Sequence, residues 1–309
     1  MILDFFRALF DRKRRLPIDR VSRAPRAVKK AAKAEIDAMQ ACLDKLGALD
    51  GIADIATIKR LPQGADALWR EFLGHYDEYL RIAAEHMGLS DALRPGTPKG
   101  RDCCYVAPFA VTGLESLVIF RTVRMWRDFP QVAQRLAQAG EQLMKDVQAH
   151  HKGADPEQIK MTSPAITDGR LENARRKIPC PLLDTQRGRC RVWEVRPLAC
   201  RGHFVSAEPE RLDPTREDYL ELPAKNLRLP IHQQVAHIQL EKRLLLQITP
   251  FLYANILVLL QLADGQTIPE NGEAPVRFGP DGVAIPAPGK GKGKGKAKGK
   301  SKGKGKSKR

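Results

Sequence analysis

The chain has 309 residues with 42% apolar side chains, enough for one large buried core or two smaller ones. Its formal net charge is +17, but residues 1–33 hold eleven Lys and Arg against three Asp, and residues 290–309 hold ten Lys, one Arg and no acid. The body between them is therefore close to neutral, which argues against a basic nucleic-acid-binding body. Six cysteines in a chain of this length also exclude a secreted disulfide scaffold.

Residues 1–24 predict a basic, amphipathic N-terminal segment. Its apolar side chains come first and the basic run Arg12–Arg15 follows, the reverse of the order in a secretory signal. We therefore expect a cytoplasmic protein. Residues 1–15 are predicted either to lie on an anionic membrane surface or to dock on the body as a helix.

Residues 25–288 predict a mainly α domain. Apolar residues recur every three or four positions between Ile36 and Leu46 and again over residues 65–88, which indicates two amphipathic helices. Gly47 is a plausible end for the first. Cys42 lies on the apolar side of that helix, where a cysteine is ordinarily a small buried residue.

Further helices are predicted from their start signals. Thr112 and Glu115 form a capping box, and Asp128 followed by Pro130 begins a helix that runs to about residue 150. Another short helix is predicted to begin at residues 155–157.

Residues 231–262 are predicted to be helical again. The stretch 244–263 has no charge, but Gln, Thr and Asn side chains and Pro250 make it a poor membrane span. A buried hairpin or a core helix kinked at Pro250 is the better interpretation, so no transmembrane span is expected. Residues 276–285 predict two short strands around a turn. The Gly-Lys repeat at 289–309 predicts a disordered tail.

Residues 176–204 differ from the helical body. Short β-like pieces flank a turn at residues 185–188, which indicates a small β-hairpin, and Pro197 suits the first turn of a short helix that carries Cys200. Metal ligands are commonly presented on such loop-rich segments.

Five of the six cysteines are the candidate ligands: Cys103, Cys104, Cys180, Cys190 and Cys200. Thiolates held together repel one another unless a cation lies between them. Three cysteines within residues 180–200 therefore indicate a metal or iron–sulfur site, with redox-active thiols as the alternative. The absence of a CxxC pair argues against a zinc ribbon or a thioredoxin-like motif.

The surrounding charge supports an anionic site. Residues 170–203 contain nine Lys and Arg against three acids. Basic groups around four metal-bound thiolates would stabilise their negative charge. Arg196 and Arg201 flank Cys200 closely enough that we expect both to support the site. His203 is an alternative ligand, but its position in a polar loop predicts a surface residue.

The run Cys-Pro-Leu-Leu-Asp…Gly-x-Cys-x-Val-Trp-Glu-x-Arg-Pro-x-x-Cys-Arg, with Cys-Cys upstream, resembles the YkgJ-type cysteine-cluster family, described as zinc- or iron-chelating. This resemblance implies that Cys103 or Cys104 joins the other three cysteines as a ligand of zinc or of a [4Fe–4S] cluster, with iron–sulfur slightly favoured. Family members often carry further cysteines just ahead of the pair. Residues 94–102 contain none, so a second metal site is not expected.

Three functions follow as hypotheses. The first is a metal-binding protein of unassigned role. The second, implied by the resemblance because the family includes a flagellin lysine N-methylase, is a lysine N-methyltransferase-like enzyme; a Gly-rich strand–loop–helix of the usual kind for S-adenosylmethionine is not apparent. The third is non-specific contact with polyanions through residues 290–309, which have no aromatic side chains to stack on bases.

Overall fold

The computed structural model describes residues 15–55, 61–151, 164–244, 246, 251–263, 277–278 and 284–285. These residues are mainly helical, which confirms the predicted fold class. The helices are α2 (Arg26–Ala31), α3 (Lys33–Gly47), α5 (Ala65–His86), α6 (Gly113–Arg124), α7 (Phe129–Ala149), α8 (Pro164–Arg175), α9 (Leu198–Arg201), α10 (Ile231–Leu244) and α11 (Leu252–Ala263).

The strands are short. A three-stranded sheet has the order β1-β5-β4, with β1 parallel and β4 antiparallel to β5. Two hairpins are formed by β2 with β3 and by β6 with β7. The bounds are β1 (Val21–Ser22), β2 (Leu183–Asp184), β3 (Arg189–Cys190), β4 (His203–Val205), β5 (Ala224–Leu227), β6 (Arg277–Phe278) and β7 (Ala284–Ile285). The 3-10 helices are η2 (Pro17–Asp19), η3 (Ile52–Asp54), η4 (Arg101–Tyr105), η6 (Trp193–Val195), η7 (Pro209–Leu212) and η8 (Glu217–Glu221).

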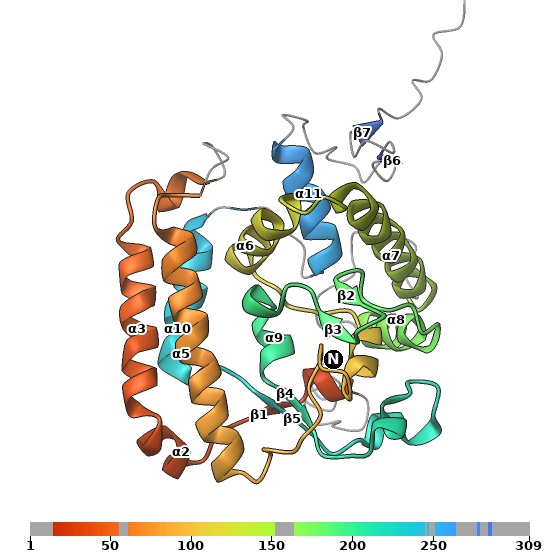
Figure 1. The fold of residues 1–309 in the computed structure, drawn as a ribbon, viewed down its shortest axis with the longest axis horizontal. Helices are drawn as coiled ribbons and strands as arrows, with labels where there is room; N and C mark the ends of the chain where they lie inside the picture. Colours follow the sequence, from red (N-terminus) through yellow and green to blue (C-terminus); the bar gives the residue numbers. More distant parts are fainter. Residues whose placement is uncertain are drawn as a thin grey trace, which may run out of the picture.

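Helices α3, α5 and α10 lie side by side at one edge of the molecule (Figure 1). The amphipathic patterns predicted for the first two are confirmed, because their apolar faces, including Met39, Cys42 and Trp69, are fully buried. Gln233 of α10 donates a hydrogen bond to Gln40 of α3 at 3.1 Å. Buried apolar side chains of all three helices belong to the main hydrophobic core of the body.

Helices α6, α7 and α11 form a second group (Figure 1). The predicted capping box at Thr112 and Glu115 is present at the start of α6. Glu241 of α10 accepts hydrogen bonds from the Gly113 and Leu114 backbone N–H groups at 2.7 and 3.1 Å. A carboxylate at a helix N-terminus satisfies otherwise unpaired donors, so this contact joins the two helical groups.

Several predicted elements are confirmed and others were missed. The helix from Asp128, the short helix after Pro197 and both hairpins are present, while α10 and α11 are two helices on either side of Pro250. None of the helices within the described ranges is long and apolar enough to cross a membrane. Helix α8 and the three-stranded sheet were not predicted from the sequence; the strands, of two to four residues, are too short to show a period.

Three predictions fall outside the described residues: the membrane-surface or docked-helix hypothesis for most of residues 1–15, the short helix at 155–157, and the tail at 289–309. The described end of the N-terminal segment is part of the body. Leu16 and Ile18 are buried, Asn226 donates a hydrogen bond to the Ile18 carbonyl, and Arg20 donates one to the Leu222 carbonyl at 2.9 Å.

Candidate metal centre

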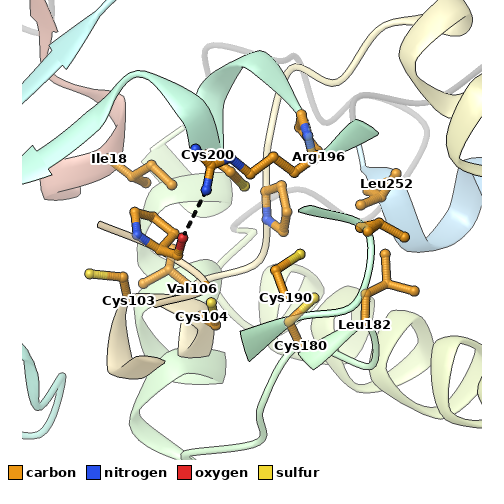
Figure 2. Close-up of a pocket in the computed structure, with 15 residues that line it drawn as sticks. Ile18, Cys103, Cys104, Val106, Cys180, Leu182, Cys190, Arg196, Cys200 and Leu252 are labelled. Atoms are coloured by element: carbon orange, nitrogen blue, oxygen red, sulfur yellow. Dashed lines mark hydrogen bonds between the residues drawn. The ribbon is translucent and has the colours of Figure 1, made fainter. Parts of the chain in front are cut away.

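All five predicted cysteines line one pocket (Figure 2). Cys103 and Cys104 lie on η4, Cys180 precedes β2, Cys190 lies on β3 and Cys200 lies on α9. The pocket encloses about 460 Å³ that protein atoms do not fill, including its opening to solvent. Its other walls are mainly apolar: Ile18, Pro95, Gly96, Val106, Pro108, Leu182, Val192, Pro197 and Leu252.

Backbone hydrogen bonds fix the cysteine-bearing segments against one another. The Cys180 N–H donates to the Cys104 carbonyl at 2.9 Å, and the Cys190 N–H donates to the Gly96 carbonyl at 3.1 Å. Gly96 has φ 75°, and a Cβ built there would lie 2.5 Å from the Cys190 Cβ. Only glycine allows the 94–100 loop to pass so close to the hairpin. The site is therefore assembled from segments about 80 residues apart in the chain.

The adjacent cysteines Cys103 and Cys104 face different surroundings. Figure 2 shows the Cys103 side chain directed away from the other sulfurs, and Cys103 is buried in a separate apolar cluster with Leu16 and Tyr219. Burial raises the pKa of Cys103 to about 12. The pKa of Cys104 is raised well above its usual value, first by burial and then by the neighbouring Cys180 and Cys200. The structure thus groups Cys104, and not Cys103, with the other three.

The remaining thiols also have raised pKa values. Burial is the main cause for Cys180 and for Cys190, whose pKa rises to about 11 with a further contribution from Cys180. The pKa of Cys200 is also raised, first by burial and then by the neighbouring Cys190. The direction of these shifts is opposite to that of a catalytic cysteine, whose pKa is lowered. A bound cation would be needed to hold them as thiolates together.

The spacing of the sulfurs bears on which metal group they could hold. Within the described part of the chain, no three of these cysteine sulfurs all lie within 4.8 Å of one another. A tetrahedral zinc ion with Zn–S bonds of about 2.3 Å would require sulfurs roughly 3.8 Å apart. The arrangement is therefore more open than a single zinc ion requires.

The two predicted arginines are both buried but have different surroundings. Arg196 is 2% exposed, lines the pocket, lies over the Trp193 ring at 3.4 Å from its centroid, and donates to the Pro95 carbonyl at 3.5 Å. Its Nε has no partner among the described residues. Burial, and then the nearby Arg94, lowers the pKa of Arg196 to about 10. A buried cation with an unpaired donor favours an anionic occupant of the pocket.

Arg201, which is 1% exposed, supports the loop that carries Arg196. It pairs with Asp77 of α5 and donates to the carbonyls of Arg196 at 3.0 Å, of Trp193 at 3.3 Å and of Glu194. All three of its side-chain nitrogens thus donate within the protein, so its contribution to the pocket is to position the loop.

Sequence analysis missed Tyr253. This buried residue of α11 forms a side-chain hydrogen bond with Cys180, and burial followed by Cys180 raises its pKa well above the usual value. Helix α11 is almost uniformly apolar, so no periodic signal distinguished the position that contacts Cys180.

The expectation that His203 is a surface residue is wrong. His203 is 3% exposed, lies on β4 opposite Asn226, and is not among the residues that line the pocket. Burial lowers its pKa to about 4. Residues after Cys200 enter the three-stranded sheet instead of a polar loop, which explains the burial.

No protein-family model, curated protein or solved structure matches this chain. The resemblance of residues 180–201 to the YkgJ-type family thus rests on the cysteine pattern itself. Function has to be argued from the site.

Proposed function

We propose that the protein binds one [4Fe–4S] cluster through Cys104, Cys180, Cys190 and Cys200. The observation that carries the proposal is the convergence of these four side chains on one pocket in which no three of the described sulfurs lie within 4.8 Å of one another, as the ligands of one zinc ion would. A four-iron cluster accepts four thiolates, and its core of iron and sulfide is larger than a single zinc ion.

The surroundings of the pocket fit such a cluster. Four thiolates on a four-iron cluster leave a net negative charge, and the unpaired Nε of Arg196 provides a buried positive donor. The hydrogen bond from Tyr253 to Cys180 is of the kind that raises a cluster's reduction potential. Apolar walls such as Val106, Leu182 and Val192 limit the access of water.

The cluster would also be a structural cross-link. Its ligands join η4, the β2–β3 hairpin and α9, whose direct connections are a few backbone hydrogen bonds. Because metal-binding free energy in such a site contributes to folding, loss of the cluster is expected to loosen the loop-rich half first.

The other functional hypotheses stay predictions. Transfer of a methyl group from S-adenosylmethionine to lysine depends on the family resemblance alone, and polyanion contact depends on residues 289–309, which lie outside the described residues.

Anaerobic purification of the full-length chain tests the proposal. Brown protein with about four iron and four sulfide per chain is the expected result. Cys104→Ser should remove the colour and the iron, while the matched neighbour variant Cys103→Ser should keep them. Colourless protein with one zinc, or equal loss in the two variants, would contradict the proposal.

A further inference from the structure

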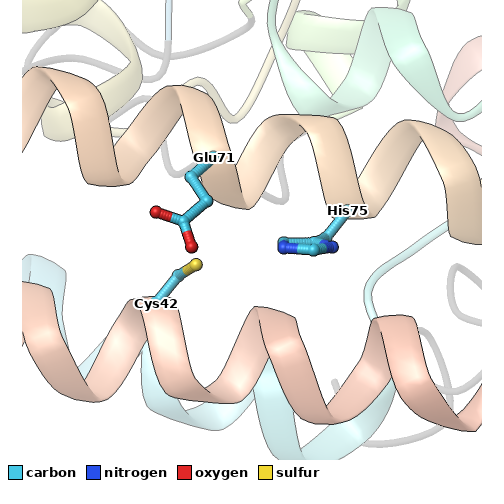
Figure 3. Close-up of side chains that lie close together, drawn as sticks. All are labelled: Cys42, Glu71 and His75. Atoms are coloured by element: carbon cyan, nitrogen blue, oxygen red, sulfur yellow. The ribbon is translucent and has the colours of Figure 1, made fainter.

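A second group of metal-ligating side chains lies between α3 and α5, among residues that do not line the cysteine pocket. The Cys42 sulfur, a carboxylate oxygen of Glu71 and a ring nitrogen of His75 all lie within 4.8 Å of one another. Figure 3 shows the three side chains directed toward one another across the gap between the two helices.

Helix periodicity explains why these residues meet. Glu71 and His75 are four residues apart and so share one face of α5. Glu35 and Cys42 are seven residues, two turns, apart on α3, which runs antiparallel to α5 (Figure 1). These faces of α3 and α5 therefore lie opposite each other where the two helices pack together.

The contacts within the group are polar. His75 Nδ1 lies 2.7 Å from the Glu35 carboxylate, and Glu71 forms a side-chain hydrogen bond with the Cys42 thiol. A cysteine that serves only as a small apolar core residue needs neither an acid nor an imidazole at its sulfur. A divalent cation that binds here would displace the thiol proton of Cys42, while the contact between His75 and Glu35 can remain.

The group lies at the edge of the core, with an approach from solvent. Cys42 is 1% exposed, the His75 and Glu35 side chains are 32% and 24% exposed, and Glu71 is exposed. The sulfur is therefore shielded from bulk water on the core side, while an ion can enter past Glu71.

We propose that Cys42, Glu71 and His75 form a zinc-class divalent cation site. Thiolate, imidazole and carboxylate are the three protein ligand types that zinc combines, and three protein ligands leave a fourth position for water. Glu35 holds the His75 ring in position, as carboxylates beside metal-bound histidines do. On binding, the Cys42 thiol proton passes to solvent as the S–metal bond forms.

This site departs from the sequence expectation of a single metal centre, and it does not depend on the iron–sulfur proposal. The compact spacing of its three ligand atoms suits one ion, whereas no three of the described sulfurs of the cysteine pocket lie within 4.8 Å of one another. The two proposals therefore predict different metals at different places.

Titration of the full-length chain with Zn(II) by calorimetry, and with Co(II) followed by thiolate-to-cobalt absorption, tests the site. We expect Cys42→Ser, His75→Gln and Glu71→Gln each to weaken binding by at least about 10-fold, and Glu35→Gln by about 10-fold. The matched control is His86→Gln, on the exposed last turn of the same helix. Its binding should equal that of the unmodified chain.

Glu71→Gln keeps the test decisive if Cys42→Ser disturbs the core, because Glu71 is exposed. Equal affinities for His75→Gln and His86→Gln, or a cobalt spectrum unaffected by Cys42→Ser, would overturn the inference. Iron content is measured in the same variants and is expected to be unchanged. Failure of this site is thereby distinguished from failure of the cluster.

Discussion

The cysteine pocket and the α3–α5 group hold thiols in different ways. In the pocket, Cys104, Cys180, Cys190 and Cys200 come from a 3-10 turn, a loop, a two-residue strand and a single-turn helix. In the helix pair, the regular spacing of two long helices places Cys42 beside Glu71 and His75.

The difference shows what each scaffold requires. Loops can hold sulfurs apart around a multi-atom cluster, but only if other contacts fix each loop, here buried Arg201 and the Gly96 close approach. Opposed helix faces bring ligands close together with no such supports. We therefore expect substitutions far from the ligands to disturb the cysteine pocket much more than the α3–α5 group.

The largest expected effect is that of Arg201→Met. It leaves three loop carbonyls without their donor, and each acceptor that is buried without a partner costs about 1–3 kcal/mol, whereas the partly exposed Asp77 can be hydrated. Chemical denaturation should show this loss together with a lower iron content, while Zn(II) affinity of folded protein is retained. Arg81→Met, an exposed change on α5, is the control and should alter neither. Similar stability of the two variants would refute the supporting role of Arg201.

Acid should weaken the loop-rich half through His203. Its pKa is about 4 when folded and buried, against a usual value of about 6.5, so the unfolded chain binds the proton more readily. Above pH 6.5 His203 therefore does not reduce the free energy of unfolding. As the pH drops from 6.5 toward 4, the free energy of unfolding falls by up to roughly 3 kcal/mol. Denaturation at a series of pH values should give a shallower slope for His203→Asn. An identical slope would show that other groups cause the acid sensitivity.

Two glycine variants compare crowding with backbone strain. Gly96→Ala and Gly64→Ala both place a side chain at positive φ, but only at Gly96 does the new Cβ meet another residue, the Cys190 Cβ. We expect Gly96→Ala to cost about 1–3 kcal/mol more than Gly64→Ala, the usual range for overpacking. The measurement is the free energy of unfolding, with bound iron assayed in parallel. Equal costs would mean that the loop can move away from the hairpin.

The smallest expected effect is that of Tyr253→Phe. It removes one hydrogen bond to Cys180, and we expect about 1 kcal/mol of lost stability and a lower reduction potential of the proposed cluster. Tyr76→Phe is the matched control, since the buried Tyr76 hydroxyl donates to the Leu227 carbonyl at 2.7 Å. Its stability should fall by a similar amount, but redox titration should give an unchanged potential. A potential that shifts equally in both variants would contradict a direct effect on the cluster.

The sequence by itself determined the helical body, because α3, α5, α6 and α7 carry clear apolar periods or start signals that depend on neighbours within one or two turns. It also determined the candidate thiols, because cysteines are few and three lie close together in the chain. Cys42 was correctly predicted to be buried from its place on the apolar side of its helix.

Only the tertiary structure decided which groups face one another. Cys103 and Cys104 are neighbours in the chain, but successive residues of a 3-10 helix point about 120° apart, and the packing around η4 selects Cys104. The partners of Cys42 lie on a different helix, and Arg201 is joined to Asp77 across 124 positions. Such contacts depend on long-range packing, which periodicity and spacing do not encode, and this is why the sequence identified the thiols but not the shape of either site.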